Sequence, residues 1–288
     1  MTLAVRVFVA STAAEWLPTR VLEFSIQETS ELPVQLNRIA TFERNIPMPR
    51  ELRNRPRTPF SFQRFLIPEL CGYQGKAIYL DADMQLVTDI CALWDSPMCA
   101  HDLLTVSESK GGRKGQFSVT LLDCERLQWR IESIVQGLDE NRYTYEQLMY
   151  EMCVASSVGR TLDPSWNSLE KYEPGQTRLL HYTDMDTQPW VSLNNPLGHL
   201  WVACLKRAID ASFITQEELT QEIAAGHVRP SLLKELNQPE VLKSELRKID
   251  AGFVAPYRAM RSGKARPWTS WRSMIGFYAR RGLQRRTR

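Results

Sequence analysis

The sequence predicts an α/β fold with a helical C-terminal part, and three observations support this class. Residues 4–10 alternate like a strand, residues 15–26 carry a helical apolar stripe, and residues 33–36 return to an extended pattern. Residues 77–80 form a short apolar run typical of a buried strand. The segments after residue 200 are mostly helical in pattern. A strand–helix–strand unit at the start of a chain favours a parallel sheet with right-handed crossovers.

The later strands and loops are predicted by composition. Residues 41–59 are rich in Arg and Pro, and residues 107–116 are rich in Gly and Lys, so both segments are expected to be loops. Apolar runs predict strands at residues 103–106 and 117–124. Helical spacing and start signals predict helices over residues 58–68, from Tyr145, over 200–209, from the capped start at Thr215, and within 227–247.

The composition describes an ordinary globular protein. A chain of 288 residues is long enough for one large domain or for a domain with an appendage. No run of about 18 apolar residues is present, so we expect no segment to span a membrane. Arg6 interrupts the first apolar stretch, which favours a strand over a signal peptide. The six cysteines are scattered without a CxxC pair, which predicts reduced thiols in a cytoplasmic protein.

The charges are distributed unevenly along the chain. Residues 256–288 hold ten Lys or Arg and no acid, which leaves 26 basic against 33 acidic residues elsewhere. A basic segment with aromatic residues predicts peripheral contact with an anionic membrane surface. A solvated tail is the alternative, and no nucleic-acid-binding motif supports contact with nucleic acid. At helical spacing one apolar face would be formed by Trp271, Met274, Ile275 and Tyr278.

Asp81 and Asp83 form the centre of the predicted site. Residues two apart in an extended chain point to the same side, so both carboxylates can converge on one point. Clustered carboxylates repel each other unless a cation lies between them, and their oxygens suit Mn²⁺ or Mg²⁺. The alternative to a metal site is a solvated turn that carries two acidic residues. The phosphatase signature of haloacid dehalogenases fits poorly, because it requires Thr or Val at the position of Gln85.

Residues with fixed spacing surround the two aspartates: Arg64, Phe65 and Pro68, then residues 76–83, then Asp89, Ile90, Leu93 and Trp94. This set resembles glycosyltransferase family 8, the retaining glycogenin-like and lipopolysaccharide galactosyltransferase-like enzymes. The resemblance implies the GT-A fold, in which the two aspartates hold Mn²⁺ against the diphosphate of a UDP-sugar. It implies a nucleotide-sugar-binding catalytic domain over residues 1–205 and a helical, basic extension over residues 206–288.

A second segment, residues 179–190, carries a histidine and ends in Gln-Pro-Trp. It resembles the family's His-(Tyr/Phe)-x-Gly-x-x-Lys-Pro-Trp motif, with one residue more. The resemblance makes His181 the third protein ligand of the metal, and a neutral imidazole suits Mn²⁺ among carboxylates. A structural histidine is the alternative. Asp184 replaces the family's Gly, and Gln188 replaces the Lys that contacts the diphosphate, so Gln188 is expected at that group.

The resemblance also implies contacts to the nucleotide. Ser11 and Thr12 occupy the loop after the first strand, which touches the uridine in the family, although the usual acidic and aromatic residues are absent. Arg64 stands where the family carries an Arg that reaches the nucleotide, and a guanidinium suits phosphate or base contact. Ala82, between the two aspartates, completes the expected donor contacts. An ordinary loop and a surface Arg are the alternatives.

Glu146 and Gln147 are the candidates for the reacting centre. They align with the family's Asp-Gln-Asp pattern, where an acid and a Gln face the reacting sugar, and Leu148 replaces the last Asp. An exposed Glu–Gln pair on a helix is the alternative. The Asn and Gly that line the family's sugar pocket are missing from residues 117–124.

The resemblance to this family therefore implies a metal-dependent retaining glycosyltransferase that moves a hexose from a nucleotide sugar, with UDP as the expected nucleotide, to a hydroxyl acceptor. The changes at Asp184 and Gln188 leave open a non-catalytic nucleotide-sugar-binding protein. A third hypothesis is an interaction module whose tail docks to a membrane or polyanion and whose GT-A domain is a relic.

Overall fold

The computed structural model describes residues 4–58, 60–107 and 117–256. Most of the predicted loop at 107–116 and the basic segment at 257–288 lie outside these ranges. The predicted membrane contact and its apolar face therefore stay predictions from the sequence. Within the described ranges, no helix is both long enough and apolar enough to cross a bilayer.

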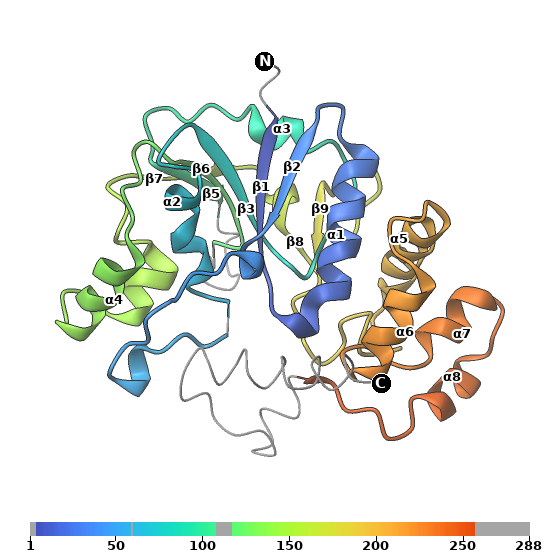
Figure 1. Cartoon of the computed structure of the whole chain (residues 1–288). Helices are drawn as coiled ribbons and strands as arrows, with labels where there is room; N and C mark the ends of the chain where they lie inside the picture. The colour runs from blue at the N-terminus through green and yellow to red at the C-terminus, as the bar shows by residue number, and fades with distance from the viewer. Residues whose placement is uncertain (1–3, 59, 108–116, 257–288) are drawn as a thin grey trace.

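A six-stranded sheet forms the centre of the fold, in the order β2-β1-β3-β6-β5-β7 (Figure 1). Its strands are β1 (Val5–Ala10), β2 (Val34–Arg38), β3 (Lys76–Asp81), β5 (Leu103–Val106), β6 (Val119–Asp123) and β7 (Val158–Leu162). The α/β class is confirmed. The expectation of a parallel sheet holds for β1 with β2 and β3, and for β5 with β7. It is wrong for β6, which runs antiparallel to β3 and β5, because an apolar run has the same pattern in either direction.

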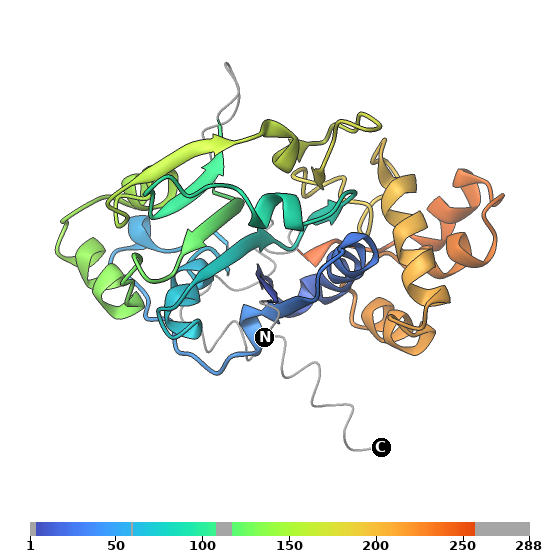
Figure 2. The same ribbon diagram turned by 90° about the horizontal axis from the view of Figure 1, so that it is seen from above.

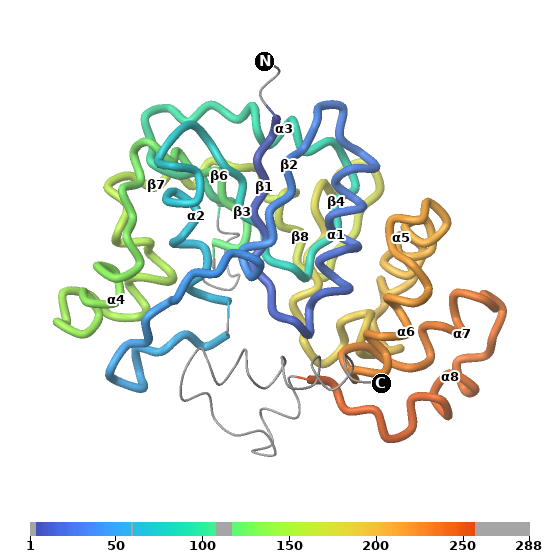
Figure 3. Tube along the Cα trace, viewed as in Figure 1, coloured from blue at the N-terminus to red at the C-terminus, as the bar shows by residue number. Residues whose placement is uncertain are grey.

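A small second sheet lies beside the first, in the order β4-β9-β8. β4 (Met84–Leu86) pairs antiparallel with β9 (Leu179–His181), and β8 (Ser168–Leu169) pairs parallel with β9. Figure 3 shows β4 beside α1 (Trp16–Thr29), and the N–H of Leu86 donates a hydrogen bond to Ser25 Oγ at 3.0 Å. This small sheet joins segments that are far apart in the chain.

Short helices and turns complete the structure. The remaining α-helices are α2 (Ile67–Leu70), α3 (Cys91–Trp94), α4 (Ile131–Asp139), α5 (Gly198–Asp210), α6 (Gln216–Ala224), α7 (Leu232–Asn237) and α8 (Lys243–Ile249). The 3-10 turns are Ala13–Glu15, Ile39–Thr41, Leu52–Asn54, Gln63–Leu66 and Pro164–Asn167, and a π-helical turn covers Gln147–Glu151. The capped start at Thr215 is confirmed, because its side chain and that of Glu218 form a reciprocal capping box.

Two predicted helices are wrong in detail. The helix expected over residues 58–68 is a 3-10 turn, Gln63–Leu66, that continues into α2. Pro68 lies in the first turn of α2, where its missing N–H costs no hydrogen bond, so it does not end the helix. The helix expected from Tyr145 does begin there, but after two α-helical residues it continues as the π-helical turn Gln147–Glu151.

Each face of the main sheet is covered by its own apolar cluster. Phe8, Tyr79 and Leu122 pack on one face with residues of α4 and of the 62–67 segment. Val7, Ile78 and Leu121 face the opposite way, toward α1 and the small sheet, and Trp166 lies in this second cluster at 1% exposure. Strand alternation thus decides which side chains share a face with the end of β3.

A third cluster joins α1 to the C-terminal helices. Leu17 and Val21 of α1 pack with Trp201 and Leu205 of α5 and with further residues of α6 and α7. Figures 1 and 2 show these helices on the α1 side of the sheet, with α4 on the opposite side. The predicted domain boundary at residue 205 falls inside α5. The division into two domains stays a prediction.

Candidate metal centre

Asp81 ends β3 at the carboxyl end of two parallel strands. It pairs with Ala10, the last residue of β1, and its N–H donates to the carbonyl of Ser118 at 3.2 Å. The chain turns at Ala82 and Asp83 and then enters β4. Asp81 is buried, while Asp83 is half-buried. The edge formed by the carboxyl ends of parallel strands is the usual place for a ligand in an α/β sheet.

The small sheet brings His181 to the two aspartates. His181 lies opposite Met84 in the antiparallel β4–β9 ladder, and the N–H of Tyr182 donates to the carbonyl of Asp83 at 2.9 Å. The imidazole Nε2 lies 3.0 Å from Asp83 Oδ1. Asp81, Asp83 and His181 each offer one ligand atom, and these atoms lie within 4.8 Å of one another. Two carboxylate oxygens and one imidazole nitrogen are a donor set that can hold a divalent cation.

Each of these three side chains has its own outer partner. The Tyr79 hydroxyl donates to Asp81 Oδ1, His181 Nδ1 lies 2.7 Å from Asn167 Oδ1, and Gln188 Nε2 donates to Asp83 Oδ2 at 3.1 Å. Such partners orient the ligands of a metal site and stabilise them in one rotamer.

Asn167 determines which imidazole nitrogen faces the cluster. Its amide oxygen only accepts hydrogen bonds, so Nδ1 of His181 carries a proton and Nε2 faces Asp83. Burial alone would lower the pKa of His181, but the carboxylates of Asp83 and Asp81 outweigh burial and raise it. A divalent cation between these groups would take the place of the proton on Nε2.

Arg64 lies beside Asp81 as a buried counter-charge. Its Nη2 is 3.6 Å from Asp81 Oδ1, its Nη1 donates to the carbonyl of Phe117 at 3.0 Å, and its guanidinium lies 4.6 Å from the centre of the Tyr79 ring. Burial raises the pKa of Asp81, the Arg64 charge lowers it and the Asp83 charge raises it again, with a net increase. The expected contact of Arg64 with a nucleotide stays a prediction.

The loop after β1 is held by side chains from two other segments. The amide of Gln63 bonds both the N–H and the carbonyl of Ser11, each at 3.2 Å. The N–H and hydroxyl of Thr12 donate to Glu15 Oε2 at 2.8 and 3.0 Å. Ser11 and Thr12 are both buried and lie next to the end of β3, because Ala10 pairs with Asp81. Their predicted contact with a uridine stays untested.

Glu146 and Gln147 bond to different parts of the chain. Glu146 is exposed and its carboxylate pairs with Arg57 Nη2 at 2.6 Å. Gln147 Oε1 accepts from the N–H of Thr144 at 2.9 Å, and its own N–H donates to Thr144 Oγ1 at 3.1 Å. Within the described ranges, their side-chain hydrogen bonds and ion pairs go to these neighbours. Their assignment to the reacting centre stays a prediction.

Three residues of the centre were not predicted from the sequence to be functional: Tyr79, Gln63 and Asn167. Tyr79 had a usable signal, because it lies two positions before Asp81 in one strand and therefore points to the same face. Gln63 and Asn167 lie in 3-10 turns, whose side-chain directions no strand periodicity predicts. Ala82 is buried at 1% exposure and offers only its backbone to a ligand.

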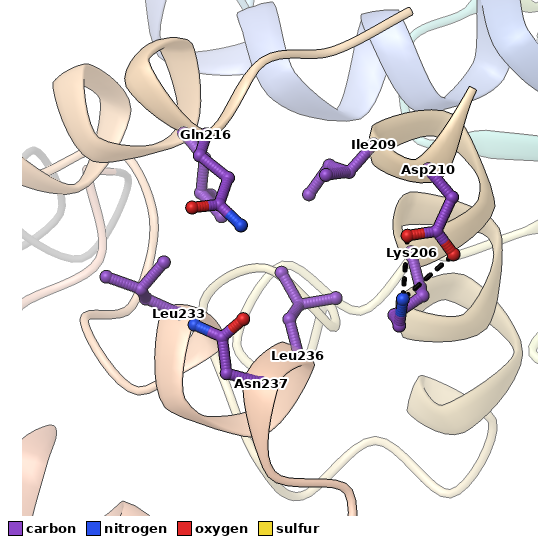
Figure 4. A pocket seen from close by; sticks show the side chains of 8 residues that line it. Lys206, Ile209, Asp210, Gln216, Leu233, Leu236 and Asn237 are labelled. Carbon is purple, nitrogen blue, oxygen red and sulfur yellow. Dashed lines mark hydrogen bonds and ion pairs between the residues drawn. The ribbon is translucent and has the colours of Figure 1, made fainter. Parts of the chain in front are cut away.

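A separate hollow lies among the C-terminal helices (Figure 4). It is lined by residues of α5, α6 and α7, and the Lys206–Asp210 ion pair closes one side with Nζ–Oδ1 at 2.7 Å. The hollow contains none of the three candidate metal ligands. It carries no functional assignment.

The chain has the fold of known glycosyltransferases. It superposes on the galactosyltransferase LgtC, crystallised with donor and acceptor sugar analogues, with a TM-score of 0.53 and 11% identity over 70% of this chain and 96% of LgtC. It superposes on the bifunctional glycosyltransferase WbbM with a TM-score of 0.53 and 13% identity over 74% of this chain and 51% of WbbM, so it spans about half of that protein. These likenesses confirm the GT-A fold implied by the resemblance to glycosyltransferase family 8.

The sequence comparison identifies the family. No protein-family profile matches the chain. The chain is 36% identical over 200 residues to the protein CDI of Arabidopsis thaliana, covering 62% of this chain and 77% of CDI. The chain therefore belongs to the family of the protein CDI.

Proposed function

We propose that the protein is a metal-dependent glycosyltransferase that moves a hexose from a nucleotide sugar to a hydroxyl acceptor. The observation that carries the proposal is the cluster of Asp81, Asp83 and His181 at the carboxyl ends of β1 and β3 in a GT-A fold. Fold alone does not define an activity, so the proposal depends on the chemistry of this cluster.

The proposed metal is Mn²⁺, with Mg²⁺ as the alternative. The donor set of two carboxylates and one imidazole suits Mn²⁺, since Mg²⁺ prefers an all-oxygen shell. Bound there, the ion would neutralise charge on the diphosphate as it leaves the sugar. The half-buried Asp83 leaves one side of the cluster open for phosphate oxygens.

The nucleotide of the donor is proposed to be UDP, bound at the edge formed by Ser11, Thr12 and Ala82. All three lie close to Asp81 along the chain or across the β1–β3 pairing. Arg64 adds positive potential there through its charge beside Asp81. The proposed transfer retains the anomeric configuration of the sugar. Glu146 and Gln147 are the residues proposed to lie beside the reacting sugar.

Two further parts of the proposal concern the rest of the chain. Residues 1–205 carry the donor site, and residues 206–288 form an extension whose basic end, residues 256–288, contacts anionic membrane from the cytoplasmic side. The charge of that end supports this contact: ten basic residues and no acid.

A non-catalytic nucleotide-sugar-binding protein is the second candidate. It is favoured by Gln188, which stands at the position of a diphosphate-binding Lys and whose amide is engaged by Asp83 and by the carbonyl of Tyr182. Without a cation at this position, less positive charge faces the leaving diphosphate. Binding of donor without transfer or donor hydrolysis would support this candidate.

A thermal-shift panel tests the proposed function. UDP, GDP, CDP and their hexose conjugates are added with and without Mn²⁺, and ligand binding to the folded state raises the melting temperature. We expect a Mn²⁺-dependent rise with UDP compounds that is lost in Asp83→Ala and kept in the control Asp95→Ala, an exposed acid at the end of α3. No rise with any nucleotide would contradict the proposal, and hexose transfer in an acceptor screen separates the transferase from the second candidate.

A further inference from the structure

We propose that Gln188 is a positioning residue for Asp83 and that its amide does not bind the donor's diphosphate. The inference rests on the proposed function, because it takes Asp81, Asp83 and His181 as metal ligands. It differs from the expectation drawn from the motif, in which residue 188 contacts the diphosphate.

The hydrogen-bonding capacity of Gln188 carries the inference. Its side-chain nitrogen has two hydrogens, and both are used inside the protein: one bonds Asp83 Oδ2 at 3.1 Å and the other bonds the carbonyl of Tyr182 at 2.9 Å. The remaining amide oxygen is an acceptor and would repel a phosphate oxygen. Gln188 is also buried, at 3% exposure. The side chain therefore has no donor left to offer to a diphosphate.

The same geometry shows what Gln188 does for the cluster. The two oxygens of Asp83 have different neighbours: Oδ2 accepts from Gln188, and Oδ1 lies 3.0 Å from Nε2 of His181. Holding Oδ2 prevents rotation of the carboxylate and keeps Oδ1 directed at the histidine. A cation held by Asp83 and His181 would find Asp83 already oriented, so less rotamer entropy would be lost on binding.

The segment around Gln188 is held by the C-terminal helical part. Arg229 is 2% exposed, its Nε donates to the carbonyl of Pro189 at 2.9 Å, and its N–H donates to the carbonyl of Trp190 at 2.8 Å. Trp190 itself is buried against Tyr182, with ring centres 6.2 Å apart. The backbone on the C-terminal side of Gln188 thus has little freedom.

Charge gives a reason for an amide at this position. A lysine here would place a cation beside Asp83 and offset the negative charge that attracts the metal. A neutral amide donates a hydrogen bond to the same carboxylate and leaves its charge in place. Gln188 therefore orients Asp83 without competing with the cation.

Mn²⁺ binding to the full chain without nucleotide tests the inference. The electron paramagnetic resonance signal of free Mn²⁺ gives the Kd for the wild type, for Gln188→Met and for Gln188→Leu. Gln188→Met keeps the side-chain length and removes both donors, so we expect the Kd to rise about 10- to 100-fold. Gln188→Leu also removes both donors and adds no charge, and we expect a rise of the same order.

Gln85→Met is the matched control. Gln85 is equally buried, accepts from the Tyr182 hydroxyl at 2.8 Å and donates to the carbonyl of Leu200 at 3.3 Å. It contacts Tyr182, as Gln188 does, but makes no hydrogen bond to Asp81, Asp83 or His181. We expect its Kd for Mn²⁺ to equal that of the wild type, so a change in Gln188→Met alone cannot be attributed to general loss of packing.

The outcomes separate the inference from the proposed function. An unchanged Kd in a folded Gln188→Met, together with weaker UDP binding at saturating Mn²⁺, would overturn the inference and favour a diphosphate contact. If Gln188→Met shows no cooperative melting, the Kd values of Gln188→Leu decide in the same way. A wild type that binds no Mn²⁺ would overturn the proposed function itself.

Discussion

Nε2 of His181 lies 3.0 Å from Oδ1 of Asp83, although the two residues are 98 positions apart in the chain. The contact follows from the β4–β9 ladder, in which His181 pairs with Met84, the residue after Asp83. The third potential ligand, Asp81, comes from the end of the main sheet. The candidate metal centre therefore depends on the small sheet lying in its place against the large one.

The first prediction concerns Asn167. Its amide oxygen accepts from Nδ1 of His181 at 2.7 Å and so determines which ring nitrogen faces the cluster. Asn167→Ala removes this acceptor, and we expect the Kd for Mn²⁺ to rise about 10- to 100-fold. The measurement is the resonance signal of free Mn²⁺. Asn194→Ala, at an exposed turn, is the control, and equal affinity in both variants would contradict the prediction.

The second prediction concerns Arg229, whose guanidinium bonds the carbonyl of Pro189 and the side chains of Ser231 and Glu235. Arg229→Met leaves these partners without their cation. We expect the free energy of unfolding to fall by about 2–4 kcal/mol. Urea unfolding followed by tryptophan fluorescence measures this change.

A surface arginine supplies the control for Arg229. Arg207 forms a two-bond pair with Glu28, at 2.6 and 2.8 Å, and its side chain is 49% exposed. Because solvent screens such pairs, we expect Arg207→Met to cost about 0–1 kcal/mol. If the free energy of unfolding fell by similar amounts in Arg229→Met and Arg207→Met, burial of Arg229 would add nothing to its contribution to stability.

The third prediction concerns Asp102. The buried carboxylate accepts from Arg126 Nε at 2.9 Å and from the N–H groups of Ser156 and Ser157 at 2.7 and 3.2 Å. Burial alone would raise the pKa of Asp102, but these hydrogen bonds outweigh burial and lower it. A carboxyl whose pKa is lowered by folding stabilises the protein above its unfolded pKa, about 3.9, and loses that effect as the pH falls through its folded pKa.

We therefore expect Asp102→Asn to be less stable than the wild type near neutral pH by about 1.5–3 kcal/mol. The difference should narrow below about pH 4, where the wild-type carboxyl takes up its proton. Urea unfolding at neutral and acidic pH measures both values. A difference that stays constant over this range would contradict the role of the Asp102 charge.

The fourth prediction concerns the boundary at residue 205. A chain that ends there loses part of α5 and all of α6 and α7, and so uncovers Leu17 and Val21 of α1. Large uncovered apolar faces lead to aggregation. We expect this truncated chain to show no cooperative melting and to aggregate and precipitate. A truncated chain with a sharp melting transition would show that residues 1–205 fold alone.

The grouping of Asp81 and Asp83 could be predicted from strand periodicity, and His181 could be added to them from the motif that resembles glycosyltransferase family 8. Asp81 and Asp83 follow an apolar strand directly, and His181 ends another. The direction of β6 could not be predicted, since an apolar run does not encode whether its neighbours are parallel. The position of Arg64 beneath Asp81 could not be predicted either, because a 3-10 turn directs its side chain differently from an α-helix.

The sequence by itself determined the α/β class and the apolar strand that precedes the two aspartates, because local periodicity specifies these features, and the resemblance to glycosyltransferase family 8 implied His181 as a third candidate ligand. Only the tertiary structure decided the partners of these three side chains. Gln188 reaches Asp83 and Asn167 reaches His181 across separate segments of the chain. Such contacts depend on how sheets and turns pack together, and pairwise distances across a fold are not encoded in any local pattern.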